Sequence, residues 1–328
     1  MPMRETKIAP AFFIGLGGCG GAIVDELARK VKQDESFERY KDLIHFFALD
    51  TDTDDLARLS WVDTAHRFVL SDFAKPEYVE LKQGKLHAKP DELFTQWWPE
   101  WYRPRDTRGK GAGQIRIESR MAFFHHLEND NAKILDTLEK AIRRAYDIHN
   151  PFRAKKAAKI YLYASLAGGT GSGGFAMMAY TMRRLLGGQR GHQLIGTFVL
   201  PNVFKSKGLP PNQFDKIMAN GYSALQELEL LQGAKPEVLV EFHYDPDHPE
   251  SKMVDRPPFD QIYLIEEKTS LGVVISDSSA IYPAIADAAH AQIFSSIIDK
   301  EGSALDNDTR ELMPVSYTHL TLPTILRV

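Results

Sequence analysis

Apolar runs of strand length alternate along the chain with longer segments of helical periodicity. The apolar runs occupy residues 11–16, 43–50, 160–166, 193–200 and 259–266. Such largely apolar runs are typical of strands that are buried on both faces of a parallel sheet. Helical spacing appears between them, at residues 22–31, 126–148, 175–186 and 213–231. The pattern therefore predicts one Rossmann-like α/β domain over residues 11–300, with a doubly wound, mostly parallel sheet.

Three further segments complete this domain. An alanine-rich segment at residues 278–299 is apolar on several faces, which predicts a long, buried central helix at the end of the domain. Residues 1–10 are expected to form an N-terminal tail. Residues 61–102 follow neither period, and we expect an insertion there. Its cluster of Trp97, Trp98 and Trp101 serves either internal packing or a partner surface.

The end of the chain departs from the pattern. Residues 301–314 are expected to begin a further C-terminal region that is cut short. The run Val-Ser-Tyr-Thr-His-Leu-Thr-Leu-Pro-Thr at residues 315–324 resembles the in-frame translation of a transposase adaptor used in sequencing libraries. We therefore expect residues 315–328 to be a non-native tail and the natural protein to continue beyond them.

Composition narrows the class of protein. The 328 residues are 43% hydrophobic and 26% charged, which is ordinary for a globular protein. The net charge of -4 gives no basic field for nucleic acid. Cys19 is the single cysteine, so no intrachain disulfide framework is possible, in keeping with a reducing compartment. No signal peptide or membrane-spanning run is visible, and we expect a cytoplasmic protein without membrane insertion.

The richest glycine turn lies between the strand at 160–166 and the helix that follows it. It contains Gly168, Gly169, Thr170, Gly171, Ser172 and Gly173. Strand, glycine turn and helix in this order let backbone N–H groups and a helix N-terminus face an anion such as phosphate. The two hydroxyl groups add donors to the same cradle. No Gly-Lys-Ser/Thr follows the glycines, which excludes a P-loop.

Two turns near the N-terminus offer a second set of candidates. Gly17, Gly18, Cys19 and Gly20 follow the first strand, and Asp50, Thr51 and Asp52 follow the second. Asp50 or Asp52 can position Mg²⁺ through water, or cap the next helix; both interpretations stay open, and no direct metal ligand is predicted. The first turn and Asp50 also fit an NAD-dependent oxidoreductase, although that alternative gives the turn at 168–173 no role.

A third glycine loop precedes the run of residues 115–124. Gly109, Gly111, Ala112 and Gly113 stand beside Arg108 and Lys110. A flexible glycine loop with basic neighbours suits an order–disorder switch on a terminal phosphate. The alternative is a solvated basic loop with no ligand.

These three loops together resemble those of the tubulin/FtsZ superfamily. Residues 167–173 match its signature Gly-Gly-Gly-Thr-Gly-Ser/Thr-Gly, with Ala167 in place of the first glycine. Residues 109–113 resemble its Gly-x-Gly-Ala-Gly loop, and the downstream Arg120 matches as well, while Ser119 replaces a glycine. Ala22 departs from the Asn or Gln that the family uses, whereas Cys19 falls where tubulins also carry a cysteine.

The resemblance implies a prokaryotic tubulin-like protein that binds GTP with Mg²⁺. It also implies GTP hydrolysis coupled to head-to-tail self-assembly, a heterologous contact that builds filaments. By the same resemblance Asn202 lies near the ribose, Asn220 reads the guanine and Tyr282 stacks on the base. An ordinary surface or capping role stays open for Asn220. No adaptor protein is indicated.

Hydrolysis itself is not assigned to a residue. In the superfamily the hydrolytic acid comes from the next subunit, from a loop after the central helix. Asp306 and Asp308 lie in the corresponding region but do not reproduce the pattern Asn-x-Asp-x-x-Asp/Glu. We therefore expect the chain to bind nucleotide and to hydrolyse it poorly alone. A nucleotide-binding scaffold that neither hydrolyses nor polymerises is the main alternative.

Overall fold

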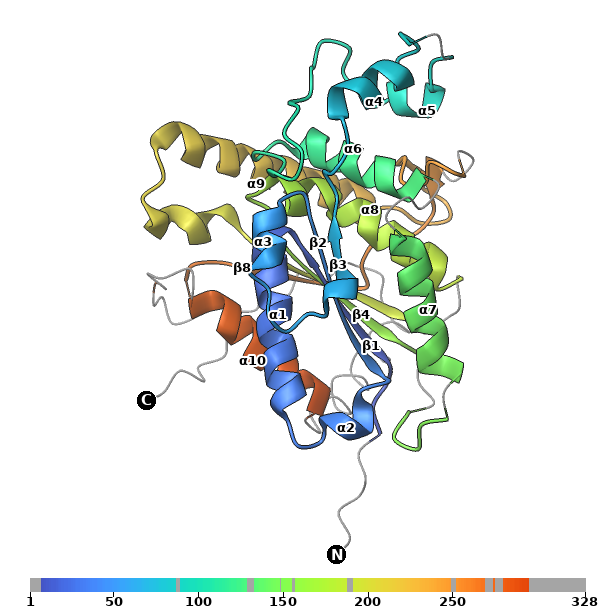
Figure 1. The fold of residues 1–328 in the computed structure, drawn as a ribbon, viewed down its shortest axis with the longest axis vertical. Helices are drawn as coiled ribbons and strands as arrows, with labels where there is room; N and C mark the ends of the chain where they lie inside the picture. The colour runs from blue at the N-terminus through green and yellow to red at the C-terminus, as the bar shows by residue number, and fades with distance from the viewer. Residues whose placement is uncertain are drawn as a thin grey trace, which may run out of the picture.

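A computed structural model describes residues 7–86, 89–128, 133–147, 149–154, 157–187, 191–248, 252–268, 274 and 280–294 (Figure 1). Its main sheet has six strands in the order β3-β2-β1-β4-β5-β8. These are β1 (Ala11–Leu16), β2 (Ile44–Asp50), β3 (Arg67–Val69), β4 (Lys159–Ser165), β5 (Gln193–Val199) and β8 (Gln261–Ile265). Every neighbouring pair is parallel. The predicted doubly wound α/β fold is confirmed, and the strand order reverses between β1 and β4.

Nine helices of the described chain connect or cover these strands. They are α1 (Gly17–Gln33), α2 (Phe37–Tyr40), α3 (Thr53–Ala57), α4 (Lys75–Lys82), α5 (Glu92–Thr95), α6 (Arg116–Leu127), α7 (Ile134–Asp147), α8 (Gly169–Leu185) and α9 (Pro211–Gln232). A further helix, α10 (Ile281–Phe294), follows the last strand. Two 3₁₀ helices span Thr64–His66 and Pro201–Lys207. The short strands β6 (Val240–Glu241) and β7 (Met253–Val254) pair with each other outside the main sheet.

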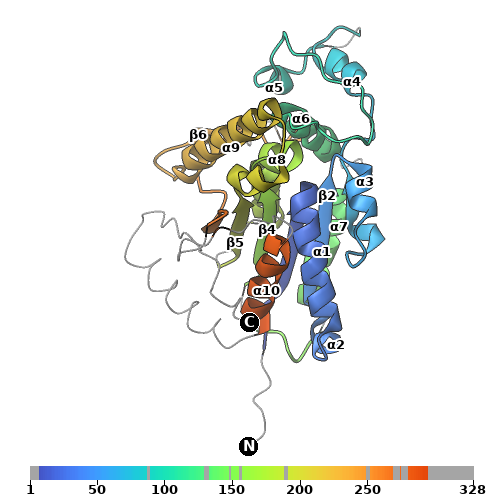
Figure 2. The same cartoon turned by 90° about the vertical axis from the view of Figure 1, so that its left-hand side faces the viewer.

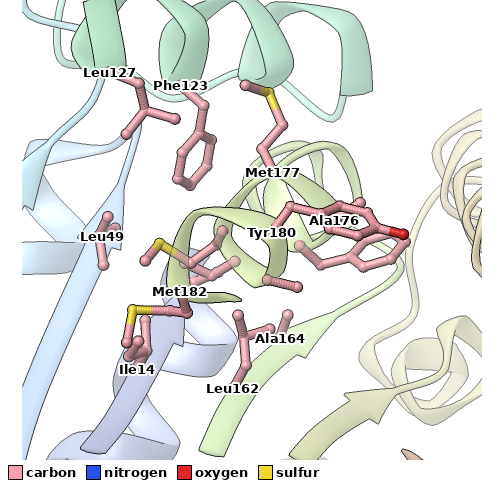
Figure 3. Packing of buried hydrophobic residues seen from close by; sticks show 14 of the residues in the cluster. Ile14, Leu49, Phe123, Leu127, Leu162, Ala164, Ala176, Met177, Tyr180 and Met182 are labelled. Atoms are coloured by element: carbon pink, nitrogen blue, oxygen red, sulfur yellow. The ribbon is translucent and has the colours of Figure 1, made fainter. Parts of the chain in front are cut away.

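The sheet is buried on both faces, which explains the largely apolar runs. Along β1, Phe12 and Ile14 enter the core on one face, whereas Phe13 enters the core on the other. The first core includes residues of α6, α7 and α8, and Figure 3 shows Ile14 and Leu162 beneath Met182 of α8. The second core includes residues of α1, α3 and α10. The helices therefore form layers on both sides of the sheet.

Helix α10 lies beside α1 in both views (Figures 1 and 2). Lys30 Nζ of α1 lies 2.6 Å from an oxygen of Asp287, and Ile281, Ile285 and Ala289 are buried. α10 is the described part of the predicted central helix. The remainder of residues 278–299 falls largely outside the described residues, and so do 301–314 and 315–328.

The predicted insertion at 61–102 begins too early. β3 lies within it and pairs with β2 as the edge strand of the main sheet. The sequence could not indicate this strand because it has only three residues. The predicted insertion would therefore start after β3, in the segment that carries α4 and α5, which stand beyond α6 in Figures 1 and 2. Its Trp98 is 3% exposed, whereas Trp101 is 80% exposed.

Two other predicted boundaries differ from the structure. The helix predicted at 126–148 is two elements, because α6 ends at Leu127 and α7 begins at Ile134. The sequence between them contains Asn129, Asp130 and Asn131, which favour turns over helix interiors. In the predicted N-terminal tail, the N–H of Ile8 donates to the Phe152 carbonyl at 2.9 Å, so the described part of the tail is held against the domain.

No helix of the described chain combines the length and the apolar character that crossing a membrane requires.

Candidate nucleotide-binding site

The predicted loops meet at one edge of the sheet. Because all six strands are parallel, their carboxyl ends lie along the same edge, and the strand order reverses between β1 and β4, the point where ligands bind in open α/β sheets. Residues 17–20, predicted as a turn, form the start of α1 directly after β1, and residues 50–52 follow β2. Residues 168–173, which we call the turn after β4, are the N-cap Gly168 and the first residues of α8. Asn202 comes after β5, the next strand along. The fold therefore brings together segments that are far apart in the sequence, from Gly17 to Asn202.

The first glycine turn packs directly on the turn after β4. A Cβ atom on Gly17 would lie 3.3 Å from the Cβ of Thr170 and 3.4 Å from the backbone nitrogen of Gly171. Gly17 also has φ of +71°, a conformation that L side chains rarely adopt. A Cβ on Gly20 would collide with the carbonyl oxygen of Tyr163. Glycines of the first turn are thus explained by packing within the protein.

Gly168 has no such explanation. It is the N-terminal cap residue of α8, with φ −79° and ψ 177°, which any residue can adopt. Among the described residues, no heavy atom lies within 4 Å of the position that its Cβ would take. No side chain caps α8, and the first-turn N–H groups of a helix have no partner within the helix. The open space at Gly168 therefore adjoins a set of backbone donors suited to an anion.

The turn after β2 is joined to the turn after β4 by hydroxyl groups. Thr170 Oγ1 donates to Asp50 Oδ1 at 2.9 Å and lies 2.7 Å from Thr51 Oγ1. Because the Thr170 proton is committed to Asp50, the Thr51 hydroxyl is the donor to Thr170. Asp50 is only 3% exposed, and burial raises the pKa of its carboxyl to about 7. Its Oδ2 has no hydrogen-bond partner among the described residues.

Asp52 adopts the capping role. Its Oδ1 accepts from the N–H of Asp54 at 2.9 Å and from that of Asp55 at 3.4 Å, at the N-terminus of α3. Its other oxygen faces the third glycine loop, 3.2 Å from the position of a Cβ on Gly111. Asp52 is half-buried, whereas Asp50 is buried. Asp52 is therefore the more accessible of the two candidate carboxylates.

The third glycine loop is not a free basic loop. The N–H of Thr53 donates to the Gly109 carbonyl at 3.0 Å, and the N–H of Gly111 donates to the Thr51 carbonyl at 2.9 Å. Gly109, Gly111 and Gly113 all have positive φ, between +55° and +77°. Ala112 then meets the turn after β4, because a Cβ on Gly169 would lie 2.8 Å from the Ala112 Cβ. The loop therefore bridges the turns after β2 and β4.

Helix α6 holds the turn after β4 from behind. Ser119 Oγ donates to the Thr170 carbonyl at 3.0 Å, and Arg116 Nε donates to the Ser172 carbonyl at 3.0 Å. Ser119, which replaces the family's glycine, thus adds a hydrogen bond. Arg120 does not reach this turn: its guanidinium lies 4.8 Å from the ring centres of both Trp97 and Phe242. The arginine at the turn is Arg116, one helical turn earlier than the motif match indicates.

The three candidates for the base and ribose lie at the same edge, and two of them, Asn220 and Tyr282, have side-chain groups engaged with the protein. Asn220 Nδ2 donates to the Gln114 carbonyl at 2.9 Å and to the Ala167 carbonyl at 3.0 Å, which fixes loop positions rather than presenting a free donor. Asn202 is half-buried on the 3₁₀ helix after β5. Tyr282 and Cys19 are joined by a side-chain hydrogen bond.

Several residues at this edge carry no sequence signal. Ser71 receives the N–H of Gly109 at 3.1 Å, and a Cβ on Gly18 would collide with the Asp55 carboxylate. Burial raises the pKa of the Asp55 carboxyl, an effect that the neighbouring Asp52 charge reinforces. Neither Ser71 nor Asp55 stands in a glycine motif, and a single serine or aspartate has no periodicity, so only the fold identifies them.

Fold and site together define a doubly wound α/β protein with three glycine loops gathered at its switch point. A sequence profile of one family, described as tubulin like, matches residues 12–322. The chain belongs to this tubulin-like family. No match was found among the curated proteins.

Solved structures similar to this chain include three tubulin-like proteins. CetZ from Methanosaeta thermophila has 13% identity over 91% of this chain and 59% of its own, with a TM-score of 0.49. FtsZ from M. jannaschii has 15% identity over 88% of this chain and 58% of its own, with a TM-score of 0.47. TubZ from Bacillus thuringiensis, in a GTPγS-form protofilament, has 12% identity over 89% of this chain and 59% of its own, with a TM-score of 0.47. The chain thus spans about three fifths of the length of each of these proteins.

Proposed function

We propose that this chain binds GTP at the edge formed by its three glycine loops, as the nucleotide domain of a cytoplasmic prokaryotic tubulin-like protein. The observation that carries the proposal is the open space at Gly168, where the N-terminus of α8 presents backbone donors. Phosphate oxygens are the groups that such a helix N-terminus takes. Membership in the tubulin-like family supports a guanine nucleotide as the source of those oxygens.

The residues fit a hydrated Mg²⁺ ion. Mg²⁺ takes oxygen ligands and keeps several waters, and Asp52 offers one carboxylate oxygen beside the third glycine loop. In the part of the chain that the structure describes, no three His, Cys, Asp or Glu side chains form a metal cluster. The nucleotide and water would therefore supply most of the ligands, and the ion would neutralise phosphate charge. Asp50 fits a supporting role, because its carboxyl group is buried behind Thr170.

The roles of Asn202, Asn220 and Tyr282 toward ribose and base belong to the same proposal. Asn220 would act through its carbonyl oxygen, which can accept from a guanine N–H, since Nδ2 already donates to two backbone carbonyls. Tyr282 would turn its ring to the base while its hydroxyl group contacts Cys19. For the whole protein we propose GTP hydrolysis coupled to head-to-tail self-assembly.

Two other functions are less well supported. An NAD-dependent oxidoreductase would place a pyrophosphate on the first glycine turn, yet Gly17 packs on Thr170 and Gly18 on Asp55. A nucleotide-binding scaffold without hydrolysis uses the same Gly168 cradle as a GTPase. Calorimetry therefore separates the oxidoreductase from the other two, and a turnover assay separates those from each other.

The test is isothermal titration of the protein with GTP, ATP and NAD, each with Mg²⁺, on wild type and on a Gly168→Val variant. Valine fits the backbone conformation of Gly168 and meets no neighbouring atom, so the variant is expected to fold. Its side chain would occupy the cradle, and GTP affinity is expected to fall by about a hundredfold or more, as when a phosphate loses its backbone donors.

The matched control is Gly187→Asn, at the other end of α8. Gly187 also has open space around its Cβ position, and its positive φ of +63° is a conformation that Asn tolerates. This variant should bind GTP as wild type does. NAD binding that ignores Gly168→Val would overturn the proposal and place the site on the first glycine turn.

A further inference from the structure

A buried carboxylate lies behind the third glycine loop. Glu118 of α6 is fully buried, and its Oε2 lies 3.2 Å from Nζ of Lys75, which is fully buried as well. Its Oε1 accepts from the hydroxyl of Tyr102 at 2.6 Å and from the backbone N–H of Arg105 at 3.2 Å. Buried charges are costly unless they are paired and hydrogen-bonded, and Glu118 meets both conditions.

The partners of Glu118 come from two segments that precede α6. Lys75 begins α4 of the insertion, and Tyr102 and Arg105 lie where the insertion runs into the third glycine loop. Lys75 Nζ also lies 3.4 Å from Oγ1 of Thr107, further along the same loop. One carboxylate therefore fixes the path by which the chain enters the loop.

Arg105 connects Glu118 to the third glycine loop. Its guanidinium donates to the Ala112 carbonyl at 2.8 Å, and its Nε lies 3.4 Å from Glu118 Oε1. A Cβ on Gly113 would collide with the same guanidinium. Ala112 in turn is the residue that packs on Gly169 at the phosphate cradle. A continuous set of contacts thus runs from Glu118 through Arg105 and Ala112 to the N-terminus of α8.

We infer that Glu118 is a positioning residue that holds the third glycine loop, through Arg105, in the arrangement that receives the terminal phosphate. The inference rests on the proposed function, because it concerns the same nucleotide site. In this inference the loop receives the terminal phosphate, and the turn after β4 with the N-terminus of α8 supplies donors for the others. Loss of the restraint should therefore weaken triphosphate binding and leave diphosphate binding nearly unchanged.

The experiment measures dissociation constants for GTPγS and GDP, with Mg²⁺, on the full chain. Arg105→Gln removes the link while the buried Lys75–Glu118 pair stays intact, and the Arg105 side chain is 46% exposed, so the variant is expected to fold. Its affinity for GTPγS is expected to fall by about tenfold, the effect of one charge-assisted hydrogen bond, with GDP affinity within about twofold of wild type. Arg103→Gln, two residues away, is the matched control, because the Arg103 guanidinium donates to the nearby carbonyls of Glu100 and Tyr102 rather than to the third glycine loop.

A second variant separates positioning from direct contact between Arg105 and phosphate. Lys75→Met combined with Glu118→Gln removes both buried charges together, which avoids leaving one of them unpaired. If Glu118 positions the loop, this double variant loses GTPγS selectivity as Arg105→Gln does, and combining all three changes adds nothing further. Tyr102→Phe, which removes one contact to Glu118, serves as a milder variant should the double variant not fold, and it is expected to lose part of the selectivity.

The outcomes distinguish the two proposals. The positioning role would be overturned if Arg105→Gln kept its preference for GTPγS over GDP. It would also be overturned if Arg105→Gln lost this preference while the Glu118 variants kept it. Wild type that binds both nucleotides equally would also overturn it, and would leave the proposed GTP site standing. Wild type that binds neither nucleotide would overturn both.

Discussion

At the scale of single residues, Asp50 has an unusual environment. Its carboxyl group is almost fully buried between the turns after β2 and β4, with Thr170 and the Asp52 N–H as partners on one oxygen. Desolvation disfavours the charged form and raises the pKa of the carboxyl group to about 7. Asp50 therefore keeps its proton at pH values where an exposed aspartate is ionised. The protonation state of Asp50, which lies between the two turns, therefore depends on pH near neutrality.

Asp50→Asn should change how stability depends on pH. Between about pH 4 and pH 7 the folded wild type keeps the Asp50 proton while the unfolded chain releases it, so the free energy of unfolding falls as pH rises through this window. The Asn variant lacks this contribution. The wild-type value minus the variant value should therefore fall by up to about 4 kcal/mol across the window and stay level above pH 7. Urea denaturation of both proteins at pH 4.5, 6 and 8 measures it; parallel profiles would contradict the buried-acid interpretation.

The sequence predicted residues of the site where they stand in motifs. The glycine turns were found because clustered glycines after an apolar run have a conformational meaning. Glu118, Asp55 and Ser71 were not found, since their roles depend on partners 13 to 43 residues away or on other loops. Arg120 was matched by spacing alone, and the aromatic rings of Trp97 and Phe242, which no motif contains, decide its position.

At the scale of elements, the closeness of α6 to α8 depends on two glycines. A Cβ on Gly173 would collide with the Arg116 carbonyl, and a Cβ on Gly174 would collide with the Phe123 ring. Both helices therefore approach until ring and backbone touch, and Phe123 fills the space that a side chain at Gly174 would take. Figure 3 shows Phe123 pointing from α6 toward α8. This contact sets the position of α8, whose N-terminus is the proposed phosphate site.

Gly174→Ala should destabilise the protein by about 1–3 kcal/mol, the usual cost of overpacking, although alanine is the better helix former. The matched control is Gly21→Ala in α1, where the added Cβ would meet only Leu59 at 3.6 Å, and a gain of about 0.5–1 kcal/mol is expected. Phe123→Leu combined with Gly174→Ala should be less destabilising than the sum of the two single changes. Thermal or urea unfolding of the four variants tests this, and a stabilising Gly174→Ala would be inconsistent with the close contact.

Helices and strands could be predicted from the sequence where their hydrophobic pattern extends over many residues. The five apolar runs became five strands of the sheet, whereas the three residues of β3 are too short to show a period. The separation of α6 from α7 was missed because apolar residues continue with helical spacing across residues 126–148. Helix propensity of the intervening Asn and Asp residues, rather than hydrophobic period, carries the information there.

At the scale of the whole molecule, the parallel sheet decides where function lies. Six strands that end at one edge bring loops from the first, second, fourth and fifth strands together, although no short stretch of sequence contains them all. The sequence predicted this convergence because the alternation of strands and helices implies a parallel sheet. The order of the strands, and hence which glycine turn faces open space, is visible only in the structure.

For the chain as a whole we predict nucleotide binding with little turnover. The superfamily's pattern for the acid that one subunit supplies to the next is not reproduced in this sequence. Phosphate release from GTP should therefore be no faster than with the Gly168→Val variant and should not rise steeply with protein concentration. A malachite-green assay together with sedimentation in GTPγS measures this. Concentration-dependent turnover with pelleting would show that the chain itself provides the acid.

The contact between Cys19 and Tyr282 has a chemical consequence. Burial raises the pKa of the Cys19 thiol to about 12, outweighing the opposing effects of the Tyr282 hydrogen bond and the Lys207 charge. The thiolate is the reactive form of cysteine, and at neutral pH almost none of it is present. The single thiol of the chain, which is half-buried in the first glycine turn, is therefore held in its protonated, less nucleophilic form. Because Tyr282 belongs to α10 and Cys19 to α1, this environment of the thiol depends on α10 lying against α1.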